Sequence, residues 1–558
     1  MTKATSNKID ISDIKFFRDE NKQILDTPDK IIRWIKYKFE EQESSTFAEP
    51  INHYIDLSNS IISTTSHNGN PSMTNLCDII KENRNNKSLD CFITNGYSNN
   101  YYQEVLEKVF CRNSLIYSAF FHNTKFHKEV DFEGSEFKGY ASFGHCCFKK
   151  NANFQNTIYT GNFDFDNCIF IGRVLFNKAK FDVYQVHFDY SIFKDRFVAN
   201  RIEFINDEIK NENRNIKPFI SFCGTEFQNE LKLSNINFTR ECNFIRTKFE
   251  SNVEFFNSDF KTSILFNNAQ INGNILFTVN DGKDENAETN TSNTIKKACF
   301  NHSSISGRID IERCQIDEFE GFFTEIKSSA ILRICESFVK SLDLTSIHNN
   351  GTLILEDNKT GIEKITLKSA INTGLIEVDN TNIQIIVDRK TARLLKDSAL
   401  KSGNTIDALE FRKKEMELLE SEIVSRDSKR LLWLNRVSNN HGTSWVRGLF
   451  FTFICSTVFY LFFLIISRLD GIYSLFTSQS VTWTLSLDFS NGIKYLWSLD
   501  FLDTLHTWVK NTDFQVIWWI LILKLIYLII GITVYIIGKI TIAYGIYQTI
   551  SAFRKYGR

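Results

Sequence analysis

The spacing of the phenylalanines restricts the possible folds of this chain more than any other feature. From Val130 to Tyr159 the sequence reads VDFEGSEFKGYASFGHCCFKKNANFQNTIY, with aromatic residues alternately five and six positions apart. This spacing matches neither the period of two of a β-strand nor the period of 3.6 of an α-helix. It extends over six units of eleven residues, from Phe121 to Phe181, and becomes irregular near 188–193 before it resumes.

An eleven-residue period also occurs in right-handed helical coiled coils, so a helical array has to be considered. In a helix, positions five apart are separated by about 140°, and the aromatics would form two stripes without the i+3 and i+4 partners of a buried seam. The segment also contains poor helix formers, including Gly134, Gly139 and Gly144. Both observations argue against helices.

The residues two positions before the aromatics are mostly small, for example Ala141, Cys146 and Ala152, with Phe163 as an exception. This pairing fits a narrow β-solenoid, because alternate residues of each short face point inward and only one of them has room to be bulky. Four faces of five or six residues close a coil of about 22 residues, and coils stack about 4.8 Å apart. The predicted solenoid core includes Phe132, Phe137, Phe143, Phe148, Phe154, Phe244 and Phe249.

The same segment resembles the pentapeptide-repeat family, whose pattern is a small residue, Asp or Asn, Leu or Phe, and two polar positions. The matches include Val130-Asp131-Phe132, Ala152-Asn153-Phe154 and Cys242-Asn243-Phe244. A sixth residue in every second unit departs from that pattern and resembles the phenylalanine-rich variants of the family. The resemblance implies a mainly β fold, a right-handed quadrilateral β-helix, with phenylalanine-rich coils over 115–329. Short β-branched and leucine runs over 330–390 predict further coils with aliphatic filling.

The segments on either side of this solenoid differ from it in composition. Residues 1–114 mix helical stretches such as DKIIRWIKYKFEEQ with polar runs, and we expect an α-rich, mixed cap over the open strand edge of the first coil. Residues 391–444 are expected to form a helical neck, beginning with two helices that break at Gly403-Asn404.

Residues 445–558 carry two long apolar runs and predict a transmembrane helical hairpin. Val446–Ser467 has 22 residues, which at 1.5 Å per residue cover about 33 Å. The second run, Phe514–Ile550, is interrupted by Lys524 and Lys539. Snorkelling of both amines toward opposite interfaces would allow this run to span a bilayer. Alternatively, Lys524 faces a water-filled path between subunits.

The residues that flank the two runs predict the orientation and the anchors of the hairpin. Basic residues precede the first run and follow the second, whereas the loop between them is rich in aspartate, so both termini are expected in the cytoplasm. Trp518 and Trp519 would lie in an aromatic belt, and Arg447, Arg554 and Lys555 would anchor the chain at the membrane interface.

The membrane end resembles the C-terminal module of bacterial pentapeptide-repeat membrane proteins through the strings NNHGTSWVRGLFFTF and AYGIYQTISAFRKYG. Some relatives of that group carry a two-helix ion-channel domain with a T-x-G-Y-G filter between the helices. Here the nearest string, Ala543-Tyr544-Gly545, lies at the end of the last run, which argues against a selective potassium pore. The resemblance implies a multi-pass protein of the bacterial inner membrane.

The sequence contains no recognisable catalytic or cofactor-binding motif. A nucleophile elbow, a phosphate-cradling glycine loop and H-E-x-x-H are all absent, so we predict neither an enzyme nor a cofactor. The 12 cysteines include no C-x-x-C pair and no metal-ligand spacing to histidine, so no metal site is predicted. A net charge of −1 argues against a nucleic-acid partner.

The leading hypothesis is a membrane-anchored interaction or scaffold protein that presents its solenoid to a cytoplasmic protein. The alternative is a membrane effector, for example in antiviral defence, whose hairpins form a homo-oligomeric pore gated by the solenoid. Lys524 and the small residues Gly531 and Gly538, which could form a pore lining or a helix interface, motivate this alternative. DNA mimicry toward a topoisomerase fits poorly, since acids and bases are nearly balanced over 115–390.

Overall fold

The protein is described from a computed structural model, which divides into two compact units, Met1–Val387 and Asp388–Arg558. Each unit is treated by itself. The structure describes residues 18–19, 22–25, 34, 54–56, 60–62, 103–106, 108–161, 163–205, 218–279, 292–423, 425–468, 506, 509 and 518–553.

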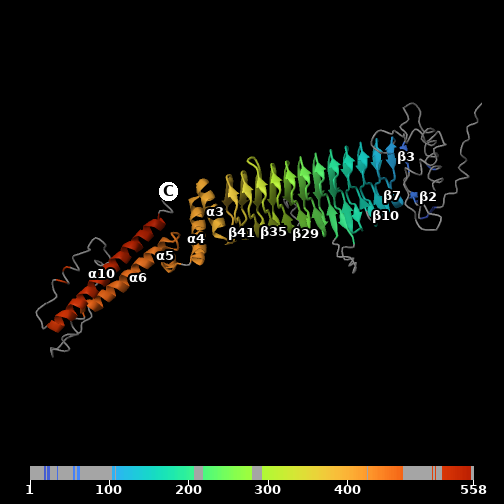
Figure 1. The fold of residues 1–558 in the computed structure, drawn as a ribbon. Coiled ribbons are helices and arrows are strands. Elements are labelled where there is room, and N and C mark those ends of the chain that lie inside the picture. Colours follow the sequence, from blue (N-terminus) through green and yellow to red (C-terminus); the bar gives the residue numbers. More distant parts are fainter. Residues whose placement is uncertain are drawn as a thin grey trace, which may run out of the picture. The chain divides into compact units, whose positions relative to one another are not determined.

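The first unit is a β-solenoid of about 11 turns, built from short parallel strands (Figure 1). One turn runs through β10 (Glu136–Ser142), which covers two faces, then β11 (Cys147–Phe148) and β12 (Ala152–Asn153). The chain then enters β13 (Ile158–Tyr159), where Tyr159 pairs with Phe137 of the preceding turn. The predicted solenoid with four faces and 22 residues per turn is therefore confirmed.

The strands form three sheets of 19, 13 and 12 strands that extend along the solenoid. The largest sheet contains two of the four faces, because β10 pairs with both β13 and β14 (Phe163–Asp164) of the next turn. Corners of the solenoid place residues at positive φ, and asparagine is frequent there because its short polar side chain tolerates this conformation. In consecutive half-turns these residues are Asn123 (φ 55°), Gly134 (71°), His145 (58°), Asn156 (55°), Asn167 (55°) and Lys178 (57°).

Aromatic rings stack from turn to turn and fill the interior of the solenoid. Phe143 stacks on Phe165 with ring centroids 4.6 Å apart, and Phe165 stacks on Phe188 at 5.5 Å. The irregular spacing near 188–193 is an insertion of one residue, since Phe163 pairs with Val186. Phe188 nevertheless stacks on Phe222 at 4.9 Å, so the column of stacked rings continues through this irregular region.

The small inward positions carry thiols and hydroxyls that satisfy backbone groups of the neighbouring turn. Cys168 Sγ donates to the carbonyl of Phe143 at 2.9 Å, and Thr247 Oγ1 donates to the carbonyl of Phe222 at 2.7 Å. Burial raises the pKa of the Cys168 thiol well above its ordinary value, so it stays protonated. These side chains combine a small volume with a donor that a buried carbonyl requires.

Aliphatic coils continue the solenoid on its C-terminal side, as predicted. Strands β37 (Ile331–Cys335), β40 (Thr352–Glu356) and β43 (Leu375–Asp379) stack in register, and β44 (Ile383–Ile386) is the last strand. Toward the N-terminus, parallel pairing already includes strands that precede residue 115. These are β3 (Tyr54–Asp56), β5 (Gln103–Val105) and β6 (Lys108–Phe110). Most of the predicted cap over 1–114 lies outside the described residues.

The second unit consists of helices. They are α3 (Arg389–Lys401), α4 (Thr405–Glu422), α5 (Arg426–Asn439), α6 (Trp445–Arg468) and α10 (Trp518–Phe553). The predicted break at Gly403-Asn404 is confirmed: Gly403 has φ 78°, and the Asn404 side chain caps α4 by accepting from the backbone N–H of Asp407. Glu415 fixes the α3–α4 pair because it accepts from both Arg393 and Lys396, at 2.9 and 2.8 Å.

Candidate functional site

The phenylalanines that define the repeat build the scaffold and do not face a partner. Each of the predicted core residues from Phe132 to Phe249 is at most 1% exposed. Contacts with other molecules must therefore involve the outward-pointing residues of the faces and corners.

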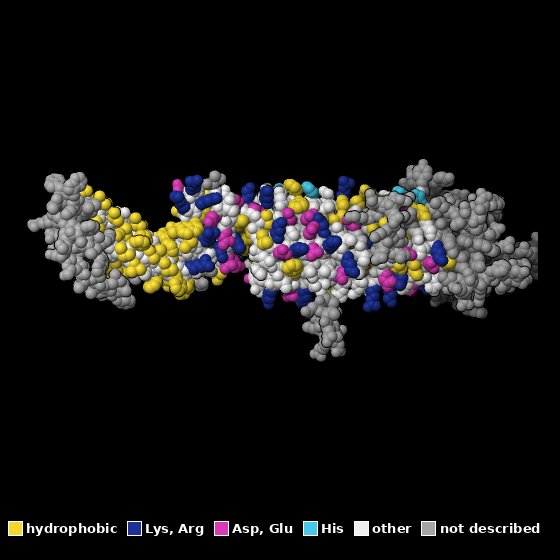
Figure 2. All heavy atoms as spheres, turned by 90° about the horizontal axis from the view of Figure 1, so that it is seen from below, with side chains coloured by type: hydrophobic (Ala, Val, Ile, Leu, Met, Phe, Trp, Pro, Cys, Tyr) yellow, Lys and Arg dark blue, Asp and Glu magenta, His cyan; other side chains and the backbone are white. Residues whose placement is uncertain are grey.

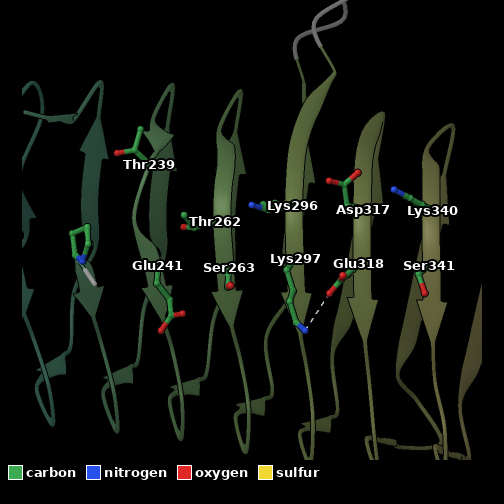
Figure 3. Close-up of a pocket in the computed structure, with 11 residues that line it drawn as sticks. Thr239, Glu241, Thr262, Ser263, Lys296, Lys297, Asp317, Glu318, Lys340 and Ser341 are labelled. Atoms are coloured by element: carbon green, nitrogen blue, oxygen red, sulfur yellow. Dashed lines mark ion pairs between the residues drawn. The ribbon is translucent and has the colours of Figure 1, made fainter. Parts of the chain in front are cut away.

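A groove of about 490 Å³ crosses one face of the largest sheet (Figure 3). The strands beneath it are β22 (Phe219–Ser221), β26 (Glu241–Asn243), β29 (Asp259–Leu265), β32 (Asn293–Cys299), β35 (Cys314–Glu320) and β38 (Phe338–Asp343). The lining residues are Pro218, Thr239, Glu241, Thr262, Ser263, Lys296, Lys297, Asp317, Glu318, Lys340 and Ser341. Parallel register brings them together, since Ser263 lies beside Lys297, and Lys297 beside Glu318.

Two hydroxyl groups in this groove lack hydrogen-bond partners. The Oγ1 atoms of Thr239 and Thr262 are buried and bond to none of the residues that the structure describes. Lys296, Asp317 and Lys340 are exposed along the same edge of the groove (Figure 3). The groove therefore offers donors, acceptors and both signs of charge to a ligand that lies across the strands.

Lys297 is the most strongly paired charge of the groove. Its Nζ lies 2.7 Å from Glu320 and 3.2 Å from Glu318. The hydrogen bond to Glu320 raises the pKa of Lys297 above its ordinary range. Burial alone would raise the pKa of Glu320, but the hydrogen bond and charge of Lys297, together with hydrogen bonds from Cys299 and Asn301, outweigh burial and hold that pKa below its usual value. This pair stays charged at neutral pH and fixes the floor of the groove.

Two helices of the second unit are long and apolar enough to cross a membrane. They contain the spans Trp445–Ile466 and Leu525–Phe553, and only 22% and 28% of their most apolar windows are buried. The core helix of a soluble protein would be mostly buried. The hydrophobic side chains that gather on the surface of these helices are visible in Figure 2 and include Leu449, Phe450, Phe453, Ile529 and Ile540.

Small residues allow α6 and α10 to approach closely. A Cβ atom added to Gly545 would lie 2.3 Å from Thr452 Oγ1, and one added to Gly448 would lie 2.6 Å from Thr549 Oγ1. Thr452 and Thr549 satisfy their hydroxyls within their own helices by donating to the carbonyls of Gly448 and Gly545. This is the small-residue packing common between helices in membranes.

A network of buried and half-buried polar side chains joins α5 to the end of α10. Tyr544 Oη donates to Asn435 Oδ1 at 2.6 Å, and Gln548 Nε2 donates to the same atom at 3.2 Å. Asn439 Nδ2 donates to the Gln548 carbonyl at 3.2 Å. The structure thus brings together the two strings that carried the resemblance at the membrane end. Tyr544 and Gly545, the nearest match to a channel filter, instead hold helices together.

The structure describes only some of the residues singled out for the predicted hairpin over 445–558. Gly531 and Gly538 are buried on α10, and Arg447 is exposed in the first turn of α6. The side chains of Trp518, Trp519 and Lys524, together with Arg554 and Lys555, lie outside the described residues. Sequence reasoning missed Gly448 and Gly545, although the spacing of Gly448, Thr452 and Ser456 by four was a readable signal.

Comparison with known proteins supports the repeat. Residues 115–158 match the family model described as pentapeptide repeats (9 copies). No curated protein and no solved structure matches the chain. Residues 115–158 are therefore similar to pentapeptide repeats, and they lie in a β-solenoid of parallel strands that is followed in the chain by helices, two of them long and apolar.

Proposed function

We propose that this protein is a membrane-anchored scaffold whose solenoid binds a cytoplasmic protein partner. The observation that carries the proposal is a long solenoid in the same chain as two apolar helices whose side chains are mostly exposed. Pentapeptide-repeat solenoids are in general structural or interaction proteins, and a filled interior leaves the outer faces for recognition. The scaffold is assigned to a bacterial inner membrane, with both termini in the cytoplasm.

Helix α5 supports attachment on the cytoplasmic side. It exposes the apolar residues Leu431, Trp433 and Val437 and the basic residues Lys429, Arg430 and Arg436. A helix that presents both groups beside a membrane span suits the headgroup region of an anionic leaflet. Because α5 ends six residues before α6 begins, this surface would continue the contact of α6 with lipid.

The anchor is tested by fractionating cells that produce the full-length chain. We expect nearly all of the protein in the membrane pellet, resistant to alkaline carbonate and released by detergent, since two apolar helices would be embedded in lipid. A cytoplasm-active reporter at the C-terminus should be active, and the same reporter inserted between α6 and α10 should be inactive. Recovery of the protein in the soluble fraction would contradict the anchor.

The groove is proposed as the surface that binds the partner, a protein segment with both acidic and basic side chains. Reversing two of its exposed charges, Lys296→Glu with Lys340→Glu, should weaken binding at least tenfold, about 1.4 kcal/mol or more. A photo-crosslinker at Thr262 would identify the partner, and binding would then be measured with purified proteins.

The control for this charge reversal is Lys194→Glu with Lys368→Glu. These lysines are also exposed on the solenoid but lie outside the groove, and the net change in charge is the same. Binding should survive in the control. Equal losses in both double variants would mean that the partner responds to overall charge, and the groove would then be rejected as its binding surface.

One observation favours a second candidate, an oligomeric pore. Lys539 on α10 is only 4% exposed, and its Nζ lies 5.5 Å from the ring centre of Tyr535. An ammonium group inside a membrane span is a frequent mark of an ion path. Ion flux through liposomes that contain the purified chain, abolished by Lys539→Met, would favour the pore. Impermeable liposomes would favour the scaffold.

A further inference from the structure

One corner of the solenoid brings two aspartates and a histidine together. Asp166 follows β14, and Asp189 follows β18 (Gln185–His187) in the next turn. Parallel register places Asp164 beside His187, and the backbone N–H of Asn167 donates to the carbonyl of Asp189 at 2.8 Å. Asp166 and Asp189 are therefore neighbours in successive turns.

The three side chains point ligand atoms at one small region. One carboxylate oxygen from each aspartate and one ring nitrogen of His187 all lie within 4.8 Å of one another. The Nδ1 atom of His187 is 3.6 Å from Asp189 Oδ2. Oδ1 of Asp189 accepts from the backbone N–H of Cys223 at 2.8 Å, and Oδ1 of Asp166 accepts from the N–H of Asp189 at 2.9 Å. Backbone N–H groups thus hold one oxygen of each carboxylate in place.

This corner carries more acidic than basic side chains. Within the described part of the chain, neither Asp166 nor Asp189 forms an ion pair with a lysine or an arginine. Asp164 brings a third carboxylate close by. Burial, together with the charge of Asp189, raises the pKa of Asp166 to about 6, and the neighbouring carboxylate of Asp189 raises the pKa of His187. A bound cation would relieve this repulsion.

We propose that Asp166, His187 and Asp189 bind one divalent first-row transition-metal ion, of the Zn²⁺ or Mn²⁺ class, whose remaining positions are taken by solvent. Imidazole with carboxylates suits these ions, whereas Ca²⁺ requires six to eight oxygen ligands, more than this corner supplies. All three residues are half-buried, so an ion can enter from solvent. The ion would cross-link two turns of the solenoid.

The test is a metal titration of the full chain in detergent after treatment with EDTA. Calorimetry with Zn²⁺, and separately with Mn²⁺, should show one site in the wild type that Asp166→Asn and His187→Gln weaken by about 10- to 100-fold or more. His302→Gln, at a distant corner, is the matched control and should bind as the wild type does. Affinity should fall from about pH 7.5 to about pH 5.5, since the metal must displace protons from Asp166 and His187.

Two further readouts make the result decisive. Zn²⁺ should raise the melting temperature of the wild type and of the His302 variant, and should leave that of the Asp166 variant unchanged. Wild type loaded with Co²⁺ should lack a thiolate charge-transfer band, which separates this site from the cysteines without any variant. Equal binding by the wild type and Asp166→Asn, a thiolate band, or the absence of binding at millimolar Zn²⁺ would each overturn the proposal.

Discussion

Phe154→Ala is expected to lower the free energy of unfolding of the solenoid by about 3 to 5 kcal/mol. The Phe154 ring is fully buried between Phe132 and Phe176, with ring centroids at 5.5 and 5.0 Å, and it meets Phe165 edge-on at 5.0 Å. The cavity cannot close by bringing the turns together, because backbone bonds such as Phe154 N to Leu175 O, 2.8 Å, fix their spacing. The lost ring contacts are therefore not replaced.

Denaturant unfolding of the full chain in detergent, followed by its β-sheet circular dichroism, measures this effect. Phe323→Ala is the matched control: Phe323 is 57% exposed at a corner with φ 54° and stacks on His302. Its replacement should change stability by about 0.5 kcal/mol or less. Similar shifts in the two unfolding midpoints would show that burial of the stacked aromatic rings does not dominate the stability of this solenoid.

The solenoid was predictable because its rule is local in sequence. An aromatic residue and a small residue two positions earlier both point inward, and this pattern fixes the faces and the 22-residue turn without any long-range information. The one-residue insertion before Val186 obscured the spacing but not the stacking, since the extra residue is absorbed at a corner. Phe163 also fits inside, packed against Tyr159 and Phe165 at 4.1 and 4.8 Å.

The surface sites were not predictable, because their residues come from different turns. In the groove, Glu241 and Ser263 are 22 positions apart, but Ser263 and Lys297 are 34 apart because a polar insertion lies between them. Asp166 and His187 also come from successive turns. They are 21 positions apart, and no short metal-binding motif spans that distance. A sequence motif detects ligands that lie within one element. In a solenoid, the ligands come from successive turns that stack along the axis.

The helix pair α6 and α10 was predictable from the sequence only in part. Gly531 and Gly538 were chosen because small residues favour helix contact, and both are buried. Gly448 and Gly545, which the prediction did not include, also lie at a close approach of α6 and α10. The hydrophobic pattern locates the helices, but the face that each one turns to its neighbour depends on the polar network at Asn435 and Gln548.

Gly545→Leu is expected to separate α6 from α10 and to disrupt this network. A Cβ at position 545 would approach the Oγ1 of Thr452 to 2.3 Å and its Cα to 3.2 Å, so the helix backbones must move apart. Overpacking of this kind costs about 1 to 3 kcal/mol. Tyr544 and Gln548, which flank this glycine, would then be drawn away from Asn435.

Hydrogen exchange of the full chain in detergent measures this separation in the peptide that joins α5 to α6. Backbone N–H groups there, such as that of Gly442, which donates to Asn439 Oδ1 at 2.9 Å, should exchange about tenfold faster or more in Gly545→Leu, as expected for a loss of at least about 1.4 kcal/mol. Ala543→Leu adds the same side chain at an exposed position of α10 and should leave exchange unchanged. Equal exchange in the two variants would mean that close packing at Gly545 does not hold the junction. The hydrogen bonds of Asn435 and Asn439 with the end of α10 would then carry the coupling between α5 and the α6–α10 pair.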